Sequence, residues 1–254
     1  MIATVAVVVP ARDEQRLLGA CLDSVNRAAH HPALAGLPVT VVVVADDCRD
    51  RTAPIARRHG AHVVEVMCSC AGAARALGTA RALELARAGS ATAAERMWLA
   101  HTDADSEVPE SWLADQIDHE RSGSHATVGR VRVEEWSGHT AATAARFARD
   151  YELPRRSAAM SPQAVGRRPG RRHRHVHGAN LGVRADAYLA VGGFPPLAVG
   201  EDHALVTALE GAGYHVTATC DARVTTSARR DPRAPGGFGH FLLDLETRTV
   251  GSQE

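Results

Sequence analysis

The stretch Thr4-Val-Ala-Val-Val-Val-Pro-Ala-Arg-Asp-Glu14 is a short β-branched run followed at once by charged residues. Such a run is typical of a buried strand, and similar segments lie at Val39–Ala45, His62–Met67 and Met97–His101. Stretches with helical spacing separate them, most clearly the alanine-rich segment Ala73–Ala88. Alternating strands and helices predict an α/β fold, with a Rossmann-like, mostly parallel sheet and helices on both faces.

The second half of the chain is expected to mix strands, helices and loops. The expected ordered segments are a strand over Ala126–Glu134, a helix over Ala141–Tyr151, order from Ala179 to Val183, helices over Ala185–Val191 and Glu201–Ala212, strands near His215–Thr219 and Arg223–Ser227, and a short helix near His240–Thr247. Residues 154–177 and 229–239 have little apolar periodicity and are expected to be mobile loops. No linker separates two cores, so residues 1–254 are expected to form one domain.

Composition excludes several kinds of chemistry. The 254 residues include 29 basic side chains, all arginine, and 29 acidic ones, so the formal net charge is zero. Without lysine there is no Schiff-base amine and no Walker-A phosphate loop. A balanced charge gives no general footprint for nucleic acid, so no nucleic-acid partner is expected.

Apolar runs and cysteines bear on location. The longest apolar runs, Val5–Val9 and Val41–Ala45, are far below the roughly 20 residues that span a bilayer, so no transmembrane segment is expected. The five cysteines are an odd number in a chain too large to need disulfides. We therefore expect reduced thiols and a cytoplasmic protein.

Acidic residues follow successive predicted strands. Ligands of open parallel sheets bind beyond the carboxyl ends of the strands, where Asp103 and Asp105 follow Met97–His101. In an extended segment two carboxylates at this spacing point the same way and suit one Mn²⁺ or Mg²⁺ ion. The alternative is that they form an Asx turn and cap the helix that starts near Glu110.

Two further acidic pairs have both a functional and a structural interpretation. Asp46 and Asp47 follow the second strand and are able to accept hydrogen bonds from a nucleotide base or ribose, or simply to end the strand. Glu201 and Asp202 stand at a predicted helix start, where the helix dipole favours acids, but a carboxylate there also suits a general base.

Histidines and arginines near residue 170 allow a third kind of site. His173, His175 and His177 alternate as zinc ligands on a strand would, but nearby arginines repel a cation and favour an anion-facing or solvated loop. Arg229 and Arg230 are either solvated or in contact with a diphosphate.

Together these segments resemble the family-two glycosyltransferases of the GT-A fold. The resemblance rests on Val7-Val-Val-Pro-Ala-Arg-Asp-Glu14, Val43-Val-Ala-Asp-Asp47, Asp103-Ala-Asp105, Gly178-Ala-Asn-Leu-Gly-Val-Arg184 with Val191-Gly-Gly-Phe194, and Glu201-Asp202-His-Ala-Leu205, in that order. It implies a donor half, residues 1–105, that binds a nucleotide-sugar, and an acceptor-side half, residues 106–254.

The resemblance also implies roles for particular residues. The donor would be held by Pro10, Ala11, Arg12, Glu14, Asp46, Asp47, Gly72, Arg75 and Asp103. Asp105, with Asp103, would bind Mn²⁺ or Mg²⁺ on the diphosphate. Asp202, beside Glu201, would deprotonate an unidentified hydroxyl acceptor and invert the anomeric carbon. A UDP-sugar is the favoured donor, and the activity expected is hexosyl transfer.

Departures from the family pattern refine this expectation. The processive Gln-x-x-Arg-Trp motif is missing, which implies transfer of a single sugar. Retaining GT-A enzymes share Asp-x-Asp and often a late metal-binding histidine, for which His240 would be the candidate. Two other functions stay open: a catalytically degenerate nucleotide-sugar-binding module, and a nucleotidyltransferase, although its glycine-rich loop and lysine are absent.

Overall fold

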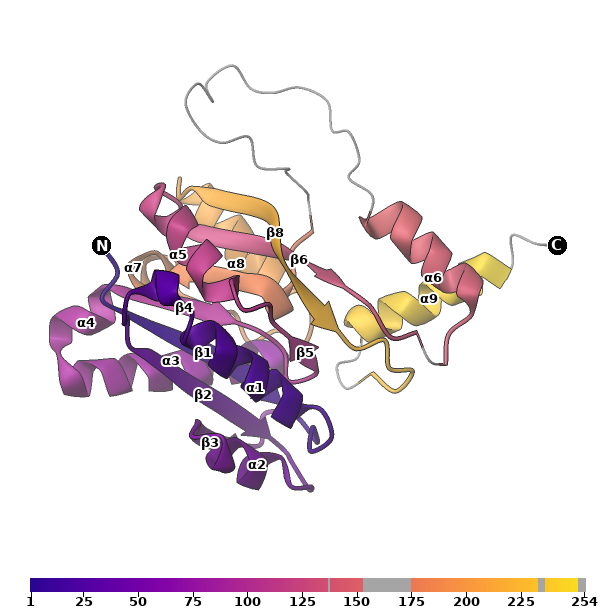
Figure 1. Cartoon of the computed structure of the whole chain (residues 1–254), viewed down its shortest axis with the longest axis horizontal. Helices are drawn as coiled ribbons and strands as arrows, with labels where there is room; N and C mark the ends of the chain where they lie inside the picture. The colour runs from indigo at the N-terminus through magenta and orange to yellow at the C-terminus, as the bar shows by residue number, and fades with distance from the viewer. Residues whose placement is uncertain (137, 153–174, 233–235, 251–254) are drawn as a thin grey trace, which may run out of the picture.

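A computed structural model of the chain describes residues 1–136, 138–152, 175–232 and 236–250. Across these residues eight strands form one sheet in the order β3-β2-β1-β4-β7-β6-β8-β5, seen in Figure 1. The strands are β1 (Thr4–Ala11), β2 (Val39–Asp46), β3 (His62–Val66), β4 (Met97–His101), β5 (Ser106–Glu107), β6 (Ala126–Arg132), β7 (Leu181–Arg184) and β8 (Val216–Thr226).

The sheet is mostly parallel. Strands β1, β2, β3 and β4 run parallel to one another, and β6 is parallel to β8. Strand β7 is antiparallel to both of its neighbours, and β5 is antiparallel to β8. The α/β class and the parallel first half were therefore predicted correctly.

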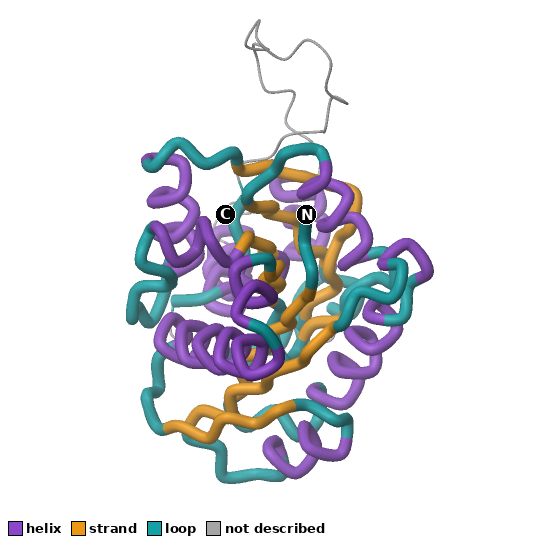
Figure 2. The backbone as a smooth tube through the Cα atoms, turned by 90° about the vertical axis from the view of Figure 1, so that its left-hand side faces the viewer, coloured by secondary structure: helices purple, strands orange, loops and turns teal. Residues whose placement is uncertain are grey.

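Alternating side chains of β1 explain how helices cover both faces of the sheet (Figure 2). Val5, Val7 and Val9 belong to one buried cluster, whereas Ala6 belongs to the other. The first face is covered by α1 (Leu18–Ala29), α2 (Thr52–Arg58) and α5 (Trp112–Arg121), and the second by α3 (Ala71–Gly89), α4 (Ala91–Glu95), α7 (Ala185–Ala190) and α8 (Glu201–Gly211). Both clusters are buried, so the parallel strands are covered on both faces, as such sheets require.

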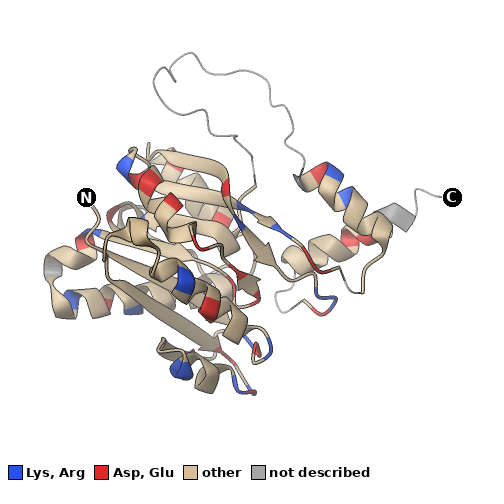
Figure 3. Cartoon of the chain, in the orientation of Figure 1, with Lys and Arg blue, Asp and Glu red and all other residues tan. Residues whose placement is uncertain are grey.

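The antiparallel strand β7 brings the two halves of the chain to the same edge. Its first residue, Leu181, pairs with His101, the last residue of β4. The 3₁₀ turn η3 (Gly178–Asn180) therefore lies directly beside the loop that carries Asp103. In the loops at this edge acidic and basic segments are mixed (Figure 3).

Strand β8 corrects one prediction. Two strands were expected near residues 215–219 and 223–227, but one strand runs from Val216 to Thr226, with its register to β6 shifted between Gly129 and Val131. The Asn180 side-chain amide donates to the carbonyls of Arg130 (3.0 Å) and Ala222 (2.7 Å), so it satisfies backbone groups at the irregularity. A buried amide from a distant segment thus bonds to both strands at the irregularity.

Helices α6 (Ala141–Phe147) and α9 (Phe238–Val250) pack against each other beyond the ends of β6 and β8 (Figure 1). Helix α6 continues as the π-helical turn η2 (Ala148–Glu152). Helix α9 begins inside the segment expected to be a loop and is longer than the predicted 240–247. The loop prediction for residues 154–174 lies outside the described residues, as does that for 233–235.

We predict that Gly78 is needed where α3 lies on the sheet. A Cβ there would lie 2.5 Å from Cγ1 of Val8 and 2.8 Å from Cγ2 of Val44. Gly78→Ala should therefore lower the free energy of unfolding by about 1–3 kcal/mol, the usual effect of overpacking a core. Urea denaturation measures the change.

Gly89 provides the matched control in the same helix. A Cβ at Gly89 meets nothing within 4 Å, so Gly89→Ala should be neutral or stabilising by up to about 1 kcal/mol. Equal effects of the two substitutions would contradict the close approach of α3 to β1 and β2.

Candidate active site

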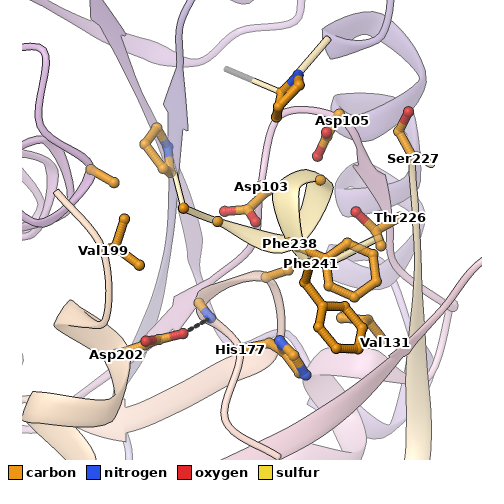
Figure 4. Close-up of a pocket in the computed structure, with 18 of the residues that line it drawn as sticks. Asp103, Asp105, Val131, His177, Val199, Asp202, Thr226, Ser227, Phe238 and Phe241 are labelled. Atoms are coloured by element: carbon orange, nitrogen blue, oxygen red, sulfur yellow. Dashed lines mark hydrogen bonds between the residues drawn. The ribbon is translucent and has the colours of Figure 1, made fainter. Parts of the chain in front are cut away.

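A cavity of about 1350 Å³ opens at the edge where β1, β2 and β4 end. All of the predicted site residues line it except Asp47 and Gly72. Figure 4 shows Asp103 and Asp105 on one side of the cavity and Asp202 on the other. The fold thus brings together acidic residues that are about 100 positions apart in sequence.

Arg75 forms the centre of the site. Its buried guanidinium, carried by α3, makes ion pairs with both Asp103 and Glu201. Burial opposes the charged form, but the neighbouring carboxylates outweigh it and raise the pKa of Arg75. Gly178 lies so close that a Cβ there would fall 2.4 Å from the guanidinium. One cation therefore ties α3, the loop after β4 and the start of α8 together.

Asp103 has an unusual protonation equilibrium. Burial raises its pKa to about 6, opposed by Arg75 and reinforced by the negative charges of Asp105 and Glu201. Burial likewise raises the pKa of Glu201, although Arg75 acts against it. The site therefore holds more negative charge than its arginines neutralise.

The Asp103–Asp105 segment is a turn, which corrects the extended conformation expected from its spacing. The N–H of Ser106 donates to the carbonyl of Asp103 at 3.1 Å and closes the turn. The alternative, an Asx turn that caps the next helix, is not what forms either, because a main-chain carbonyl closes the turn and α5 begins at Trp112 with Ser111 as its N-cap. Both carboxylates line the cavity.

Arg229 makes a second bridge, between Asp105 (2.5 Å) and Glu14 (2.7 Å). Burial lowers the pKa of its guanidinium, but the negative charges of Asp105 and Glu14 raise it by more. The net effect is a raised pKa. From the sequence Arg229 was either solvated or in contact with a diphosphate, and in the structure it lines the cavity. Arg230 lies outside the cavity lining and pairs with Glu246 (2.6 Å).

Asp202 is held by backbone groups rather than by a cation. One carboxylate oxygen accepts the N–H of Gly178 (2.8 Å), drawn as a dashed line in Figure 4, and the other accepts the N–H of His203 (2.7 Å). Each oxygen keeps a further lone pair. Asp202 is therefore oriented toward the cavity and retains the capacity to accept a proton.

The two aspartates after β2 have different surroundings. The carboxylate of Asp46 accepts the backbone N–H groups of Cys68 (2.8 Å), Ser69 (2.9 Å) and Cys70 (3.2 Å). Asp47 has a positive φ of 51° and pairs with Arg12 at 2.9 Å. Asp46 thus shapes the loop that leads into α3, and Arg12 with Asp47 fixes the loop after β1.

Gly72 lies outside the cavity lining and packs against the backbone of residues 195–197. Its N–H donates to the carbonyl of Leu197 (3.0 Å), and a Cβ would lie 2.2 Å from the carbonyl oxygen of Pro195. The glycine therefore lets α3 approach the backbone that precedes Glu201.

His101 and His240 lie outside the cavity lining. His101 is fully buried against Phe194, with ring centroids 4.8 Å apart, and burial, with Arg75 nearby, lowers its pKa to about 3. The lining does not include His240. Among the described residues, the one group of three ligand atoms within 4.8 Å of one another is Asp13, Cys48 and Asp50. The two aspartates there accept hydrogen bonds from loop backbone.

An aromatic group lines the other end of the cavity and was not predicted. We call it the aromatic wall, and its members are Phe147, Tyr151, His175, His177, Phe238 and Phe241. The alternation of His175 and His177 had suggested zinc or an anion, but both rings pack here, and His173 lies outside the described residues. Only the aromatic spacing in residues 147–151 and 238–241 could have indicated this wall.

Comparison with known proteins agrees with this geometry. The model of the glycosyltransferase-like family 2 matches residues 3–236, so the chain belongs to that family. No curated protein sequence gives a match.

Solved structures of the GT-A type share the fold. The chain TarS 1–349 of S. aureus with UDP-GlcNAc has a TM-score of 0.61 and 14% identity, over 97% of this chain and 66% of that one. The mannosyltransferase PcManGT of Pyrobaculum calidifontis with GDP-Man and Mn²⁺ has a TM-score of 0.58 and 16% identity, and the match covers 99% of this chain and 75% of that one. Glucosyl-3-phosphoglycerate synthase of Mycobacterium tuberculosis with UDP has a TM-score of 0.53 and 17% identity, and the match covers 98% of this chain and 80% of that one. This chain thus spans less than two thirds of the TarS chain's length.

We predict that the hydrogen bonds of Asp46 make stability depend on pH. Burial alone would raise its pKa, but the three N–H donors outweigh burial and lower it. The stabilisation is therefore present above the unfolded pKa of about 3.9 and is lost as the pH falls through the lower folded value. Asp46→Asn should cost about 1.5–3 kcal/mol at pH 7, and the difference from wild type should shrink below pH 4.

Urea denaturation from pH 7 to pH 3 measures this difference, and Asp118→Asn is the control because Asp118 is exposed on α5. A deficit of Asp46→Asn that stayed constant down to pH 3 would show that the charge of Asp46 is not what holds the loop.

Proposed function

We propose that this family-two glycosyltransferase is metal-dependent and moves one sugar from a nucleotide-diphosphate sugar to a hydroxyl acceptor with inversion. The observation that carries the proposal is that one cavity holds a paired-aspartate turn, Asp103 and Asp105, and a separate oriented carboxylate, Asp202. In a metal-assisted inverting transfer the paired carboxylates would hold the ion at the leaving group, and the separate carboxylate would deprotonate the acceptor.

The donor fits the side of the cavity built from the first half of the chain. Pro10, Ala11 and Arg12 line it beside Asp46 and Ser69, which offers backbone and carboxylate groups to a base and ribose. The diphosphate would lie toward Arg229, whose guanidinium suits phosphate oxygens. Related folds hold UDP-GlcNAc, UDP or GDP-Man. We favour a UDP-sugar.

The residues at the turn fit a divalent cation such as Mn²⁺ or Mg²⁺. Glu14, Asp103 and Asp105 are hard oxygen ligands of the type that these ions prefer. Burial, reinforced by the negative charges of Asp105 and Glu201, raises the pKa of Asp103, and a bound cation would favour its charged form. Asp105 and Asp103 would hold the ion, which would supply charge stabilisation for the departing diphosphate.

The chain's own groups supply the rest of the reaction. Asp202 takes the proton of the acceptor hydroxyl as its oxygen bonds to the anomeric carbon. The bond from that carbon to the diphosphate breaks, and its electron pair leaves with the diphosphate. Arg229 stabilises that charge, while Arg75 keeps Asp103 and Glu201 fixed. Attack from the side opposite the leaving group inverts the carbon.

Location and mode of transfer are part of the same proposal. All five cysteines lie in the described residues and none forms a disulfide, which suits a reducing cytoplasm. In the part of the chain that the structure describes, no helix has the length and apolar character needed to cross a bilayer. Transfer of a single sugar is supported by the lack of the processive Gln-x-x-Arg-Trp motif.

We predict metal-dependent nucleotide binding. Calorimetric titration of UDP, GDP and dTDP with and without Mn²⁺ should show one nucleotide that binds tightly only with the metal. Asp105→Asn should reduce its affinity to the metal-free level, because a ligand charge is lost, whereas Asp118→Asn should not. Tight binding without Mn²⁺ would refute the metal dependence, and failure of every nucleotide would refute the donor site.

We also predict that Asp202→Asn lowers the rate of nucleoside diphosphate release by about 10²–10⁴-fold, the usual contribution of a general base. The asparagine oxygen still accepts the N–H of Gly178, so nucleotide affinity should not change. Steady-state assays with acceptor, or with water alone, measure the rate. Nucleotide binding without any release, unaffected by this substitution, would instead indicate a degenerate binding module.

A further inference from the structure

Aromatic residues of this chain are few and are concentrated at one place. The sequence contains 3 Trp, 3 Tyr and 4 Phe. Half of these pack together where α6, η2 and α9 meet, namely Trp136, Phe147, Tyr151, Phe238 and Phe241. His175 and His177 extend the group, with centroids 4.2 Å and 5.6 Å from that of Tyr151.

The aromatic wall has a buried base and an accessible face. Phe147 and Tyr151 stack with centroids 4.5 Å apart and are nearly fully buried, which anchors α6 to the rest of the wall. Phe241 leaves 43% of its surface exposed, and Phe238 is half-buried. Figure 4 shows both phenylalanine rings among the residues that line the cavity. Part of the ring surface of Phe238 and Phe241 is thus accessible and is not buried in the hydrophobic core.

The aromatic wall is directly connected in sequence to the residue that holds the proposed base, Asp202. His177, which contacts Phe238 with centroids 5.9 Å apart, directly precedes Gly178, whose N–H holds Asp202. An acceptor whose hydroxyl reaches Asp202 therefore places the remainder of its structure toward these rings.

Apolar side chains supply much of the surface at this end of the cavity. Val131, Phe238, Phe241 and Leu245 supply side chains with no hydrogen-bonding group. The Tyr151 hydroxyl is bonded to the His177 ring, and Arg146 pairs with Asp150 at 3.5 Å. A planar ring bound here gains edge and offset contacts with the aromatic side chains.

We propose that the acceptor is an aromatic alcohol, a phenol whose ring packs on the aromatic wall while its hydroxyl meets Asp202. The proposal rests on the proposed function. The phenolic oxygen bonds to the anomeric carbon as the carbon–diphosphate bond breaks. Its proton passes to Asp202, and the bonding electron pair leaves with the diphosphate.

Binding of the phenol 4-methylumbelliferone to the full chain, loaded with Mn²⁺ and the nucleotide found by titration, tests this directly. We expect it to bind more tightly than methyl glucoside or 1-octanol. Phe241→Ala should weaken binding about tenfold, whereas Phe241→Trp should retain it. Leu189→Ala is the control, because Leu189 is another exposed apolar residue and lies outside the cavity lining.

Nucleotide affinity, measured on the same samples, separates the two proposals. If nucleotide binds but methyl glucoside or 1-octanol binds better than the phenol, the acceptor class is wrong. The same holds if Phe241→Ala leaves phenol binding unchanged. If wild type binds no nucleotide, the proposed function fails, and the acceptor proposal fails with it.

Discussion

The ion pairs of the buried Arg75 guanidinium are the interaction on which the rest of the site depends. They connect the middle of the first half, through α3, to Asp103 in the loop after β4 and to Glu201 at the start of α8. Removing one partner of such a buried cluster typically costs about 3–5 kcal/mol, since the remaining charges are left uncompensated. The planar, delocalised guanidinium suits this place because it addresses two carboxylates at once, which a lysine ammonium does less well.

The antiparallel strand β7 converts that local cluster into a site with two sides. Because Leu181 pairs with His101, η3 reaches the carboxyl edge of the parallel strands. Asn180 then fixes η3 from within, since its side chain contacts Trp112 (2.9 Å) as well as the backbone of β6 and β8. The same turn presents the Gly178 N–H to Asp202. Donor groups and the proposed base are thus positioned by one continuous network.

The sequence predicted the parts of this structure that depend on local pattern. Short apolar runs separated by helical spacing predicted the parallel strands, and of the acids that follow those strands Glu14, Asp46, Asp103 and Asp105 line the cavity. What it missed depends on distant partners. Asn180 bonds to the backbone of β8 from a distant segment, Asp46 bonds to the backbone of Cys68–Cys70, and the aromatic wall joins residues about 90 positions apart. Local periodicity carries no information about such pairings.

Both Asp46 and Asp202 are held by main-chain N–H groups, and this affects how the chain tolerates change. The donors at residues 68–70 belong to the peptide backbone, so exchanging those side chains leaves every one of them in place. Proline is the exception, because it has no N–H to donate. At residue 178 the limit is space as well, since any side chain would meet Arg75. The first loop therefore tolerates exchange at Cys68 and Cys70, while Ser69, with a φ of 48°, disfavours β-branched and bulky residues. Residue 178 is restricted to glycine.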